Sequence, residues 1–147
     1  MARHYRSLPV TTRGSGEQYV RSHYARAVQA FRSQSHDANA SLVVMTDADM
    51  LSVAARRKTL DDALRQAEQA PRSTNERIVL LIPKRNVETW VAHLNGAAVD
   101  ENSDYKPRPV EEFRSAATQL HAHCGAAATQ CCPPSLLDGC TELHRLS

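Results

Sequence analysis

Residues 42–49 read Leu-Val-Val-Met-Thr-Asp-Ala-Asp, and this stretch decides the fold that we predict for the chain. Four apolar residues lead it, two of them β-branched, and the polar residues 36–39 precede them, which is typical of a short buried strand. A strand that is apolar on both faces belongs in the middle of a parallel sheet covered by helices. The stretch therefore predicts an α/β protein with a central strand over about residues 41–46.

Two carboxylates, Asp47 and Asp49, follow this strand directly. Because side chains alternate along a strand, we expect both to point the same way at its carboxyl end, where open α/β sheets place their ligand sites. Neighbouring carboxylates repel, and a hard cation such as Mg²⁺ (or Mn²⁺) relieves that repulsion. The alternative is that Asp49 caps a helix beginning near Met50 and that Asp47 is a solvated turn residue.

A second apolar run, residues 77–82, predicts a second buried strand. Between the two strands, residues 50–70 have the composition of an amphipathic helix, which Pro71 ends. Strand, helix and strand in this order predict a right-handed βαβ unit with parallel strands.

Charged residues also follow the second strand. Lys84 and Arg85 would neutralise phosphate at the same edge of the sheet. Asn86 can cap a short helix that runs to Leu94, with Glu88 in its first turn. Glu88 is a candidate third acid beside Asp47 and Asp49, or it only complements the helix dipole.

A glycine turn precedes the first long helix. Residues 5–12 predict a short, irregular strand interrupted by Pro9, and a helical pattern runs from the turn to about Ser33. Free backbone N–H groups at such a helix start suit an anion, although a tight turn with a serine cap explains the pattern equally well. The candidate phosphate-binding residues here are Arg13, Gly14, Ser15 and Gly16.

Composition limits the classes of protein that remain. The chain has 147 residues, 41% of them hydrophobic, which suffices for one core. Its formal charge of +2 decides nothing about nucleic acid. We expect no membrane association and a cytoplasmic protein with reduced cysteines, because neither a run of ~20 apolar residues nor a secretory signal is visible.

We assign residues 1–109 to an α/β domain and residues 110–147 to a C-terminal helical extension that packs on it. Helices are predicted over about 110–123 and 135–146. The tail contains a group of thiols and imidazoles that either binds zinc or contributes small buried thiols between helices, since its spacings form no clean ligand pairs. The members of the group are His121, His123, Cys124, Cys131, Cys132, Cys140 and His144.

Three motifs together resemble the TOPRIM-like domains of topoisomerases, primases and overcoming-lysogenization-defect nucleases. They are Gly-Ser-Gly-Glu at residues 14–17, Asp-x-Asp at 47–49 and Asn-x-Glu-x-Trp at 86–90. The resemblance covers residues 5–96 and is closest to small bacterial relatives, some of them associated with phage defence. It implies a small three-layer parallel sheet of TOPRIM or Rossmann type, and Mg²⁺ held by acids for phosphoryl transfer.

The resemblance is incomplete at the first acid. Family members commonly read Glu-Gly-x-x-Glu, whereas Arg13 stands here at the first glutamate and Glu17 matches the second. We therefore predict a Mg²⁺-dependent nuclease or phosphoryl-transfer domain acting on nucleic acid. The alternative is a non-catalytic module that binds phosphate or a nucleotide, or a subunit of a defence complex, and a homodimer is compatible with either. The candidate catalytic residues are Glu17, Asp47, Asp49 and Glu88, of which the first three would hold the metal.

Overall fold

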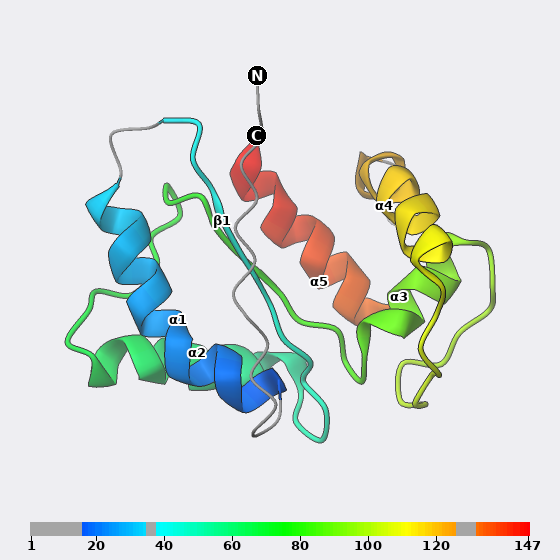
Figure 1. Cartoon of the computed structure of the whole chain (residues 1–147), viewed down its shortest axis with the longest axis horizontal. Coiled ribbons are helices and arrows are strands. Elements are labelled where there is room, and N and C mark those ends of the chain that lie inside the picture. Colours follow the sequence, from blue (N-terminus) through cyan, green and yellow to red (C-terminus); the bar gives the residue numbers. More distant parts are fainter. Residues whose placement is uncertain (1–15, 35–37, 126–131) are drawn as a thin grey trace.

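The computed structural model describes residues 16–34, 38–125 and 132–147, with the backbone alone for residues 16–18. Within these ranges the protein is α/β, and five α-helices accompany a two-stranded sheet (Figure 1). None of the described helices combines the length and apolar character needed to cross a bilayer. The elements in chain order are α1 Gly16–Ser33, β1 Leu42–Met45, α2 Val53–Gln66, β2 Ile78–Leu81, α3 Val87–Leu94, α4 Val110–Gly125, α5 Pro134–Leu143 and a 3₁₀ turn His144–Leu146.

The two strands are parallel, as the sequence predicts. Leu42 lies opposite Ile78, and the register continues to Met45 opposite Leu81. Backbone pairing extends past β1, because the Ala48 N–H donates to the Pro83 carbonyl at 2.8 Å. The carboxyl ends of both strands therefore stay together where the candidate acids begin. The predicted strand over residues 5–12 lies outside the described residues, so the three-layer sheet stays a prediction.

One face of the sheet is covered by α1 and α2. Tyr24 and Val28 from α1 and Leu60 and Leu64 from α2 are buried side chains in this core. From the sheet, β2 and the residue after it contribute Ile78, Leu80 and Ile82, and β1 adds the partly buried Leu42 and Val44. This apolar layer fixes the crossover helix α2 between the strands that it connects.

Helices α3 and α5 cover the opposite face of β2. Trp90 of α3 and Leu136 of α5 pack with Val79 and Leu81 in a second core. On the same face, Val43 and Met45 of β1 are 50% and 43% exposed. Burial on both faces is therefore confirmed for β2 and is wrong for β1 within the described chain. The reason is that the helical residues of this core pack on β2.

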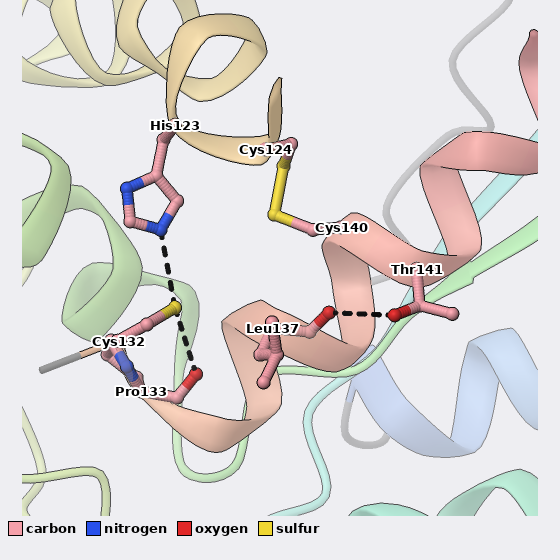
Figure 2. The surroundings of a disulfide bond; sticks show 7 residues. All are labelled: His123, Cys124, Cys132, Pro133, Leu137, Cys140 and Thr141. Atoms are coloured by element: carbon pink, nitrogen blue, oxygen red, sulfur yellow. Dashed lines mark hydrogen bonds between the residues drawn. A yellow bond between two sulfur atoms is a disulfide. The ribbon is translucent and has the colours of Figure 1, made fainter. Parts of the chain in front are cut away.

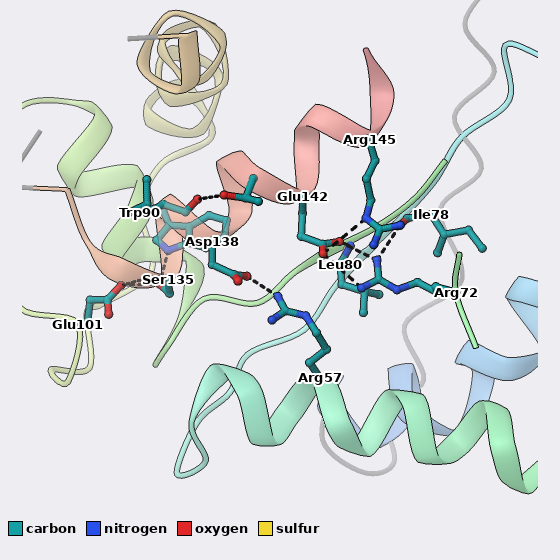
Figure 3. A network of polar contacts seen from close by, with 12 residues as sticks. Arg57, Arg72, Ile78, Leu80, Trp90, Glu101, Ser135, Asp138, Glu142 and Arg145 are labelled. Carbon is teal, nitrogen blue, oxygen red and sulfur yellow. Dashed lines mark hydrogen bonds and ion pairs between the residues drawn. The ribbon is translucent and has the colours of Figure 1, made fainter. Parts of the chain in front are cut away.

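Among the described residues, charged side chains bond the edge of β2 that faces away from β1 (Figure 3). Alternate residues of a parallel strand direct their backbone groups to opposite sides. The Leu80 N–H donates to Glu142 of α5 at 2.9 Å, and the Ile78 carbonyl accepts from Arg72 at 2.8 Å. Arg72 and Glu142 also form a two-point ion pair, with N–O distances of 2.7 and 3.2 Å. The ion pair thus bonds backbone groups of β2 that a neighbouring strand would otherwise bond.

Gly139 of α5 faces the indole of Trp90 in α3. A Cβ atom there would lie 2.9 Å from Cη2 of Trp90 and 3.5 Å from Leu81. The indole has little freedom to retreat, because its Nε1–H donates to Ser135 Oγ at 2.8 Å. We expect Gly139→Ala to lower the free energy of unfolding by about 1 kcal/mol, since overpacking outweighs the better helix propensity of alanine. Urea denaturation measures the change.

Gly125 provides the matched control for this substitution. It also lies in a helix, but a Cβ atom there would meet nothing within 4 Å. Gly125→Ala should leave the stability unchanged or raise it slightly. Equal effects at both glycines would contradict the close contact between α5 and Trp90.

Candidate functional site

Asp47 lies half-buried at the carboxyl end of β1. Burial is the main reason that its pKa rises from 3.8 to about 6, and the negative charges of Glu88, Asp49 and Asp104 add to the rise. Arg56 opposes it. The structure thus brings acids from three separate segments of the chain into electrostatic contact with one half-buried carboxyl group.

The backbone at this strand end is held by the buried Arg56 of α2. Its Nε donates to the Asp47 carbonyl at 2.9 Å, and its Nη2 donates to the Ala48 carbonyl at 3.3 Å. The guanidinium in this position donates to the backbone carbonyls just past the end of β1. It also places a positive charge close to the acids.

Asp49 does not cap the following helix, so that alternative is wrong. Ser52 is the N-cap of α2, and its side chain accepts from the Ala55 N–H at 3.0 Å. Asp49 instead adopts a left-handed φ of 55°, which turns the chain away from the strand direction. Three residues that the sequence places in the helix therefore form a turn before it.

Lys84 and Arg85 both bind this turn. Arg85 Nη1 lies 2.6 Å from Asp49 Oδ1, in an ion pair whose carboxylate side chain is 59% exposed. Lys84 Nζ donates to the carbonyls of Asp49 and Leu51 at 3.2 and 2.8 Å. The two cations do lie at the acidic edge, as predicted, and one of them is paired with a candidate metal ligand.

Asn86 connects the edge to the loop that follows α3. It stands at the N-cap position of α3 without the expected side-chain cap. Its Nδ2 instead donates to Asp104 Oδ1 at 2.6 Å and to the Tyr105 carbonyl at 3.0 Å. Asp104 is not among the acids that the sequence predicts at this edge. The acid-rich composition of residues 100–104 was a signal, but no spacing rule connects that loop to Asp47.

The structure places only the backbone of two of the remaining predicted site residues. Arg13, Gly14 and Ser15 lie outside the described residues. Gly16 is the first residue of α1 and Glu17 the second, and the structure describes no side chain at Glu17. Their proposed roles in phosphate and metal binding stay predictions.

His123 and three cysteines of the tail, Cys124, Cys132 and Cys140, form a separate group (Figure 2). Cys124 and Cys140 are joined by a disulfide, so the expectation of reduced thiols is wrong for this pair. Cys132 is a free thiol, and burial, with the charge of Glu101, raises its pKa. Its sulfur lies near ring nitrogens of His93 and His123, with all three ligand atoms within 4.8 Å of one another.

A surface depression between α3 and α4 has a volume of about 400 Å³. Its lining includes neither the acidic residues at the end of β1 nor the cysteines and histidines of the tail group.

Fold and site together define an α/β protein with an acidic edge on a parallel sheet. No protein-family model, curated protein or solved structure matches this chain.

Proposed function

We propose that the acidic edge binds a divalent cation, Mg²⁺ or Mn²⁺, through Asp47 and Glu88, and that the protein uses it for phosphoryl transfer on nucleic acid. A bound cation would orient a phosphodiester, activate water and stabilise the charge that develops on the phosphate oxygens. Nuclease activity is the simplest reaction of this class.

The observation that carries the proposal is the half-buried carboxyl group of Asp47, surrounded by further acids. Burial is the main cause of the raised pKa of Asp47, and repulsion by the neighbouring acids adds to it. A bound cation would remove that repulsion, so keeping these acids together favours metal binding. Functional sites commonly retain such unfavourable electrostatics. Glu88, whose charge acts on Asp47 more strongly than the other acids do, is the second ligand.

The ion pair between Arg85 and Asp49 suggests how substrate would enter. A phosphodiester offers Arg85 two oxygen acceptors in the geometry that a guanidinium binds at two points. Arg85 would exchange Asp49 for the substrate phosphate, and the released Asp49 would join the metal. Lys84 would hold the turn during this exchange through its bonds to the backbone carbonyls.

Calorimetric titration with Mn²⁺ tests the metal site. We expect micromolar binding by the wild type and at least tenfold weaker binding by Asp47→Asn and by Glu88→Gln, because each removes one charged ligand. Glu111→Gln is the control, since Glu111 is an exposed acid on α4. Absence of binding in the wild type, or equal loss in the control, would contradict the proposal.

Cleavage assays on single- and double-stranded DNA and RNA with Mg²⁺ test the reaction. The activity should fall at least 100-fold in Asp47→Asn, while folding is preserved. Binding of Mn²⁺ without cleavage of any substrate would support the metal site and reject the nuclease.

A second candidate function is supported by the pairing of Arg85 with Asp49. An acid neutralised in this way contributes less to a metal site, as expected of a module that binds phosphate or a nucleotide without cutting it, alone or within a defence complex. If the protein is such a module, the wild type and Asp47→Asn should bind a nucleotide equally well, and Arg85→Ala should bind it weakly. Dependence on Asp47 would favour the metal enzyme.

A further inference from the structure

The strongest unassigned group of side chains lies between α3, α4 and the start of α5, where His93, His123 and Cys132 meet. His123 Nε2 lies 3.2 Å from Cys132 Sγ. The rings of His93 and His123 are in edge-to-face contact, with centroids 5.3 Å apart and planes at 84°. Within the described ranges, this is the group whose metal-type ligand atoms all lie within 4.8 Å of one another.

We infer that His93, His123 and Cys132 form a zinc-binding site that ties α3, α4 and α5 together. Two imidazoles and a thiolate are ligands that Zn²⁺ prefers over Mg²⁺ or Ca²⁺. Tetrahedral zinc holds neighbouring nitrogen and sulfur ligands about 3.3–3.6 Å apart, so the spacing between His123 and Cys132 is already close to that of a site. The acidic edge of the sheet takes no part in it.

Each ligand adjoins buried or disulfide-linked residues. His93 follows the buried residues Trp90, Val91 and Ala92 of α3. His123 precedes Cys124, whose disulfide to Cys140 fastens the end of α4 to α5 beside the site (Figure 2). Cys132 packs against the second core and is followed by the buried Pro133. Ligands held in this way lose little conformational freedom when a metal binds.

The surroundings suit a cation. Glu101 lies close enough to act electrostatically on Cys132, and its carboxylate accepts from the Ser135 N–H at 2.8 Å. Negative charge beside a thiolate ligand balances a divalent ion. Three protein ligands leave the fourth position of a tetrahedral ion for water, and all three side chains are only half-buried.

Co²⁺ and Zn²⁺ titrations of the full chain, with its disulfide intact, test the site. Tetrahedral Co²⁺ with a thiolate ligand gives a near-ultraviolet charge-transfer band. This band should disappear when one equivalent of Zn²⁺ displaces the bound Co²⁺. We expect Cys132→Ser to abolish this band and both Cys132→Ser and His93→Gln to weaken Zn²⁺ binding at least 100-fold. His121→Gln is the control, since His121 is exposed on the same helix as His123. An absent wild-type band, or loss of the band in Cys131→Ser but not in Cys132→Ser, would overturn the inference.

Two further measurements keep the test independent of variant folding. On the wild type, Zn²⁺ at a hundredfold excess over Kd should raise Tm by about 5–10 °C. It should also protect Cys132 from alkylation, as mapped by mass spectrometry. Alkylation of Cys132 at the same rate with and without Zn²⁺ would overturn the inference even if every variant unfolded.

Discussion

Replacing Glu142 with alanine should cost about 3–5 kcal/mol of unfolding free energy, the largest effect that we expect of a single substitution in this fold. Its side chain is 10% exposed and that of Arg72 is 6% exposed. Removal of the carboxylate leaves a buried guanidinium without its counter-charge and the Leu80 N–H without its acceptor. Urea denaturation at neutral pH gives the value.

The exposed ion pair Arg108–Glu112 is the control for this prediction. It joins Arg108, which lies just before α4, to the first turn of that helix at 3.2 Å, and its side chains are 33% and 38% exposed. Glu112→Ala should change the stability by about 0.5 kcal/mol or less. The double variant Arg72→Ala/Glu142→Ala should cost less than the two single variants together, because removal of both charges leaves neither one buried alone. Additive costs would contradict a coupled pair.

The pH dependence of the Glu142 contribution has a definite sign. Burial by itself would raise the pKa of Glu142, but hydrogen bonds from Arg72 and the Leu80 N–H, with the charge of Arg72, hold it below 4.5. The ion pair therefore stabilises the fold fully above pH 4.5, and its contribution is lost as the pH falls through the lowered pKa.

Asp47→Asn should make the protein more stable at pH 7.5, by about 1–2 kcal/mol after allowance for solvent screening of a half-exposed group. The folded-state pKa of about 6 lies above the ordinary value of 3.8. Between these values the folded state binds more protons than the unfolded state, so the contribution of Asp47 to stability decreases as the pH rises from about 4 to 6. The asparagine variant should lose this dependence. Urea denaturation from pH 4 to pH 8 measures both effects.

Asp49→Asn is the matched control for Asp47→Asn. Asparagine tolerates the left-handed φ of this turn, and the exposed carboxylate that it replaces is paired with Arg85. We expect little change in the stability of Asp49→Asn at any pH.

If the proposed metal site is correct, millimolar Mg²⁺ should also stabilise the wild type more than Asp47→Asn. Overlapping pH profiles of wild type and Asp47→Asn would show that Asp47 ionises in the fold without cost.

The strands could be predicted from the sequence because their apolar runs are local signals. The runs around residues 42–45 and 78–81 gave both strands and their parallel pairing. The start of α2 was misplaced because Ser52, three residues beyond Asp49, supplies the cap, and composition alone does not reveal a left-handed turn. The exposure of Val43 and Met45 depends on which strand the helices pack against, and no pattern within β1 encodes that.

The candidate site could be predicted only in part. The topology places four of the charged residues at one edge, because they follow the strand ends closely: Asp47, Asp49, Lys84 and Arg85. Glu88 reaches the same edge from the first turn of α3. Asp104 reaches that edge through a side-chain hydrogen bond from Asn86. The group of His93, His123 and Cys132 needs the packing of α3 against α4 and α5, and the partner of Cys140 proved to be Cys124. Such long-range contacts carry no periodic signal in the sequence.

The closure of the β2 edge by Glu142 also has a consequence during protein synthesis. Sixty-two residues separate Glu142 from Leu80. A ribosome that adds about 5–20 residues per second needs about 3–12 s to make them. Until Glu142 has been made, the outer edge of β2 lacks the carboxylate that bonds it, and its N–H and C=O groups can pair with another extended segment. Addition of α5 therefore ends the period in which this edge of the nascent chain is open to aggregation.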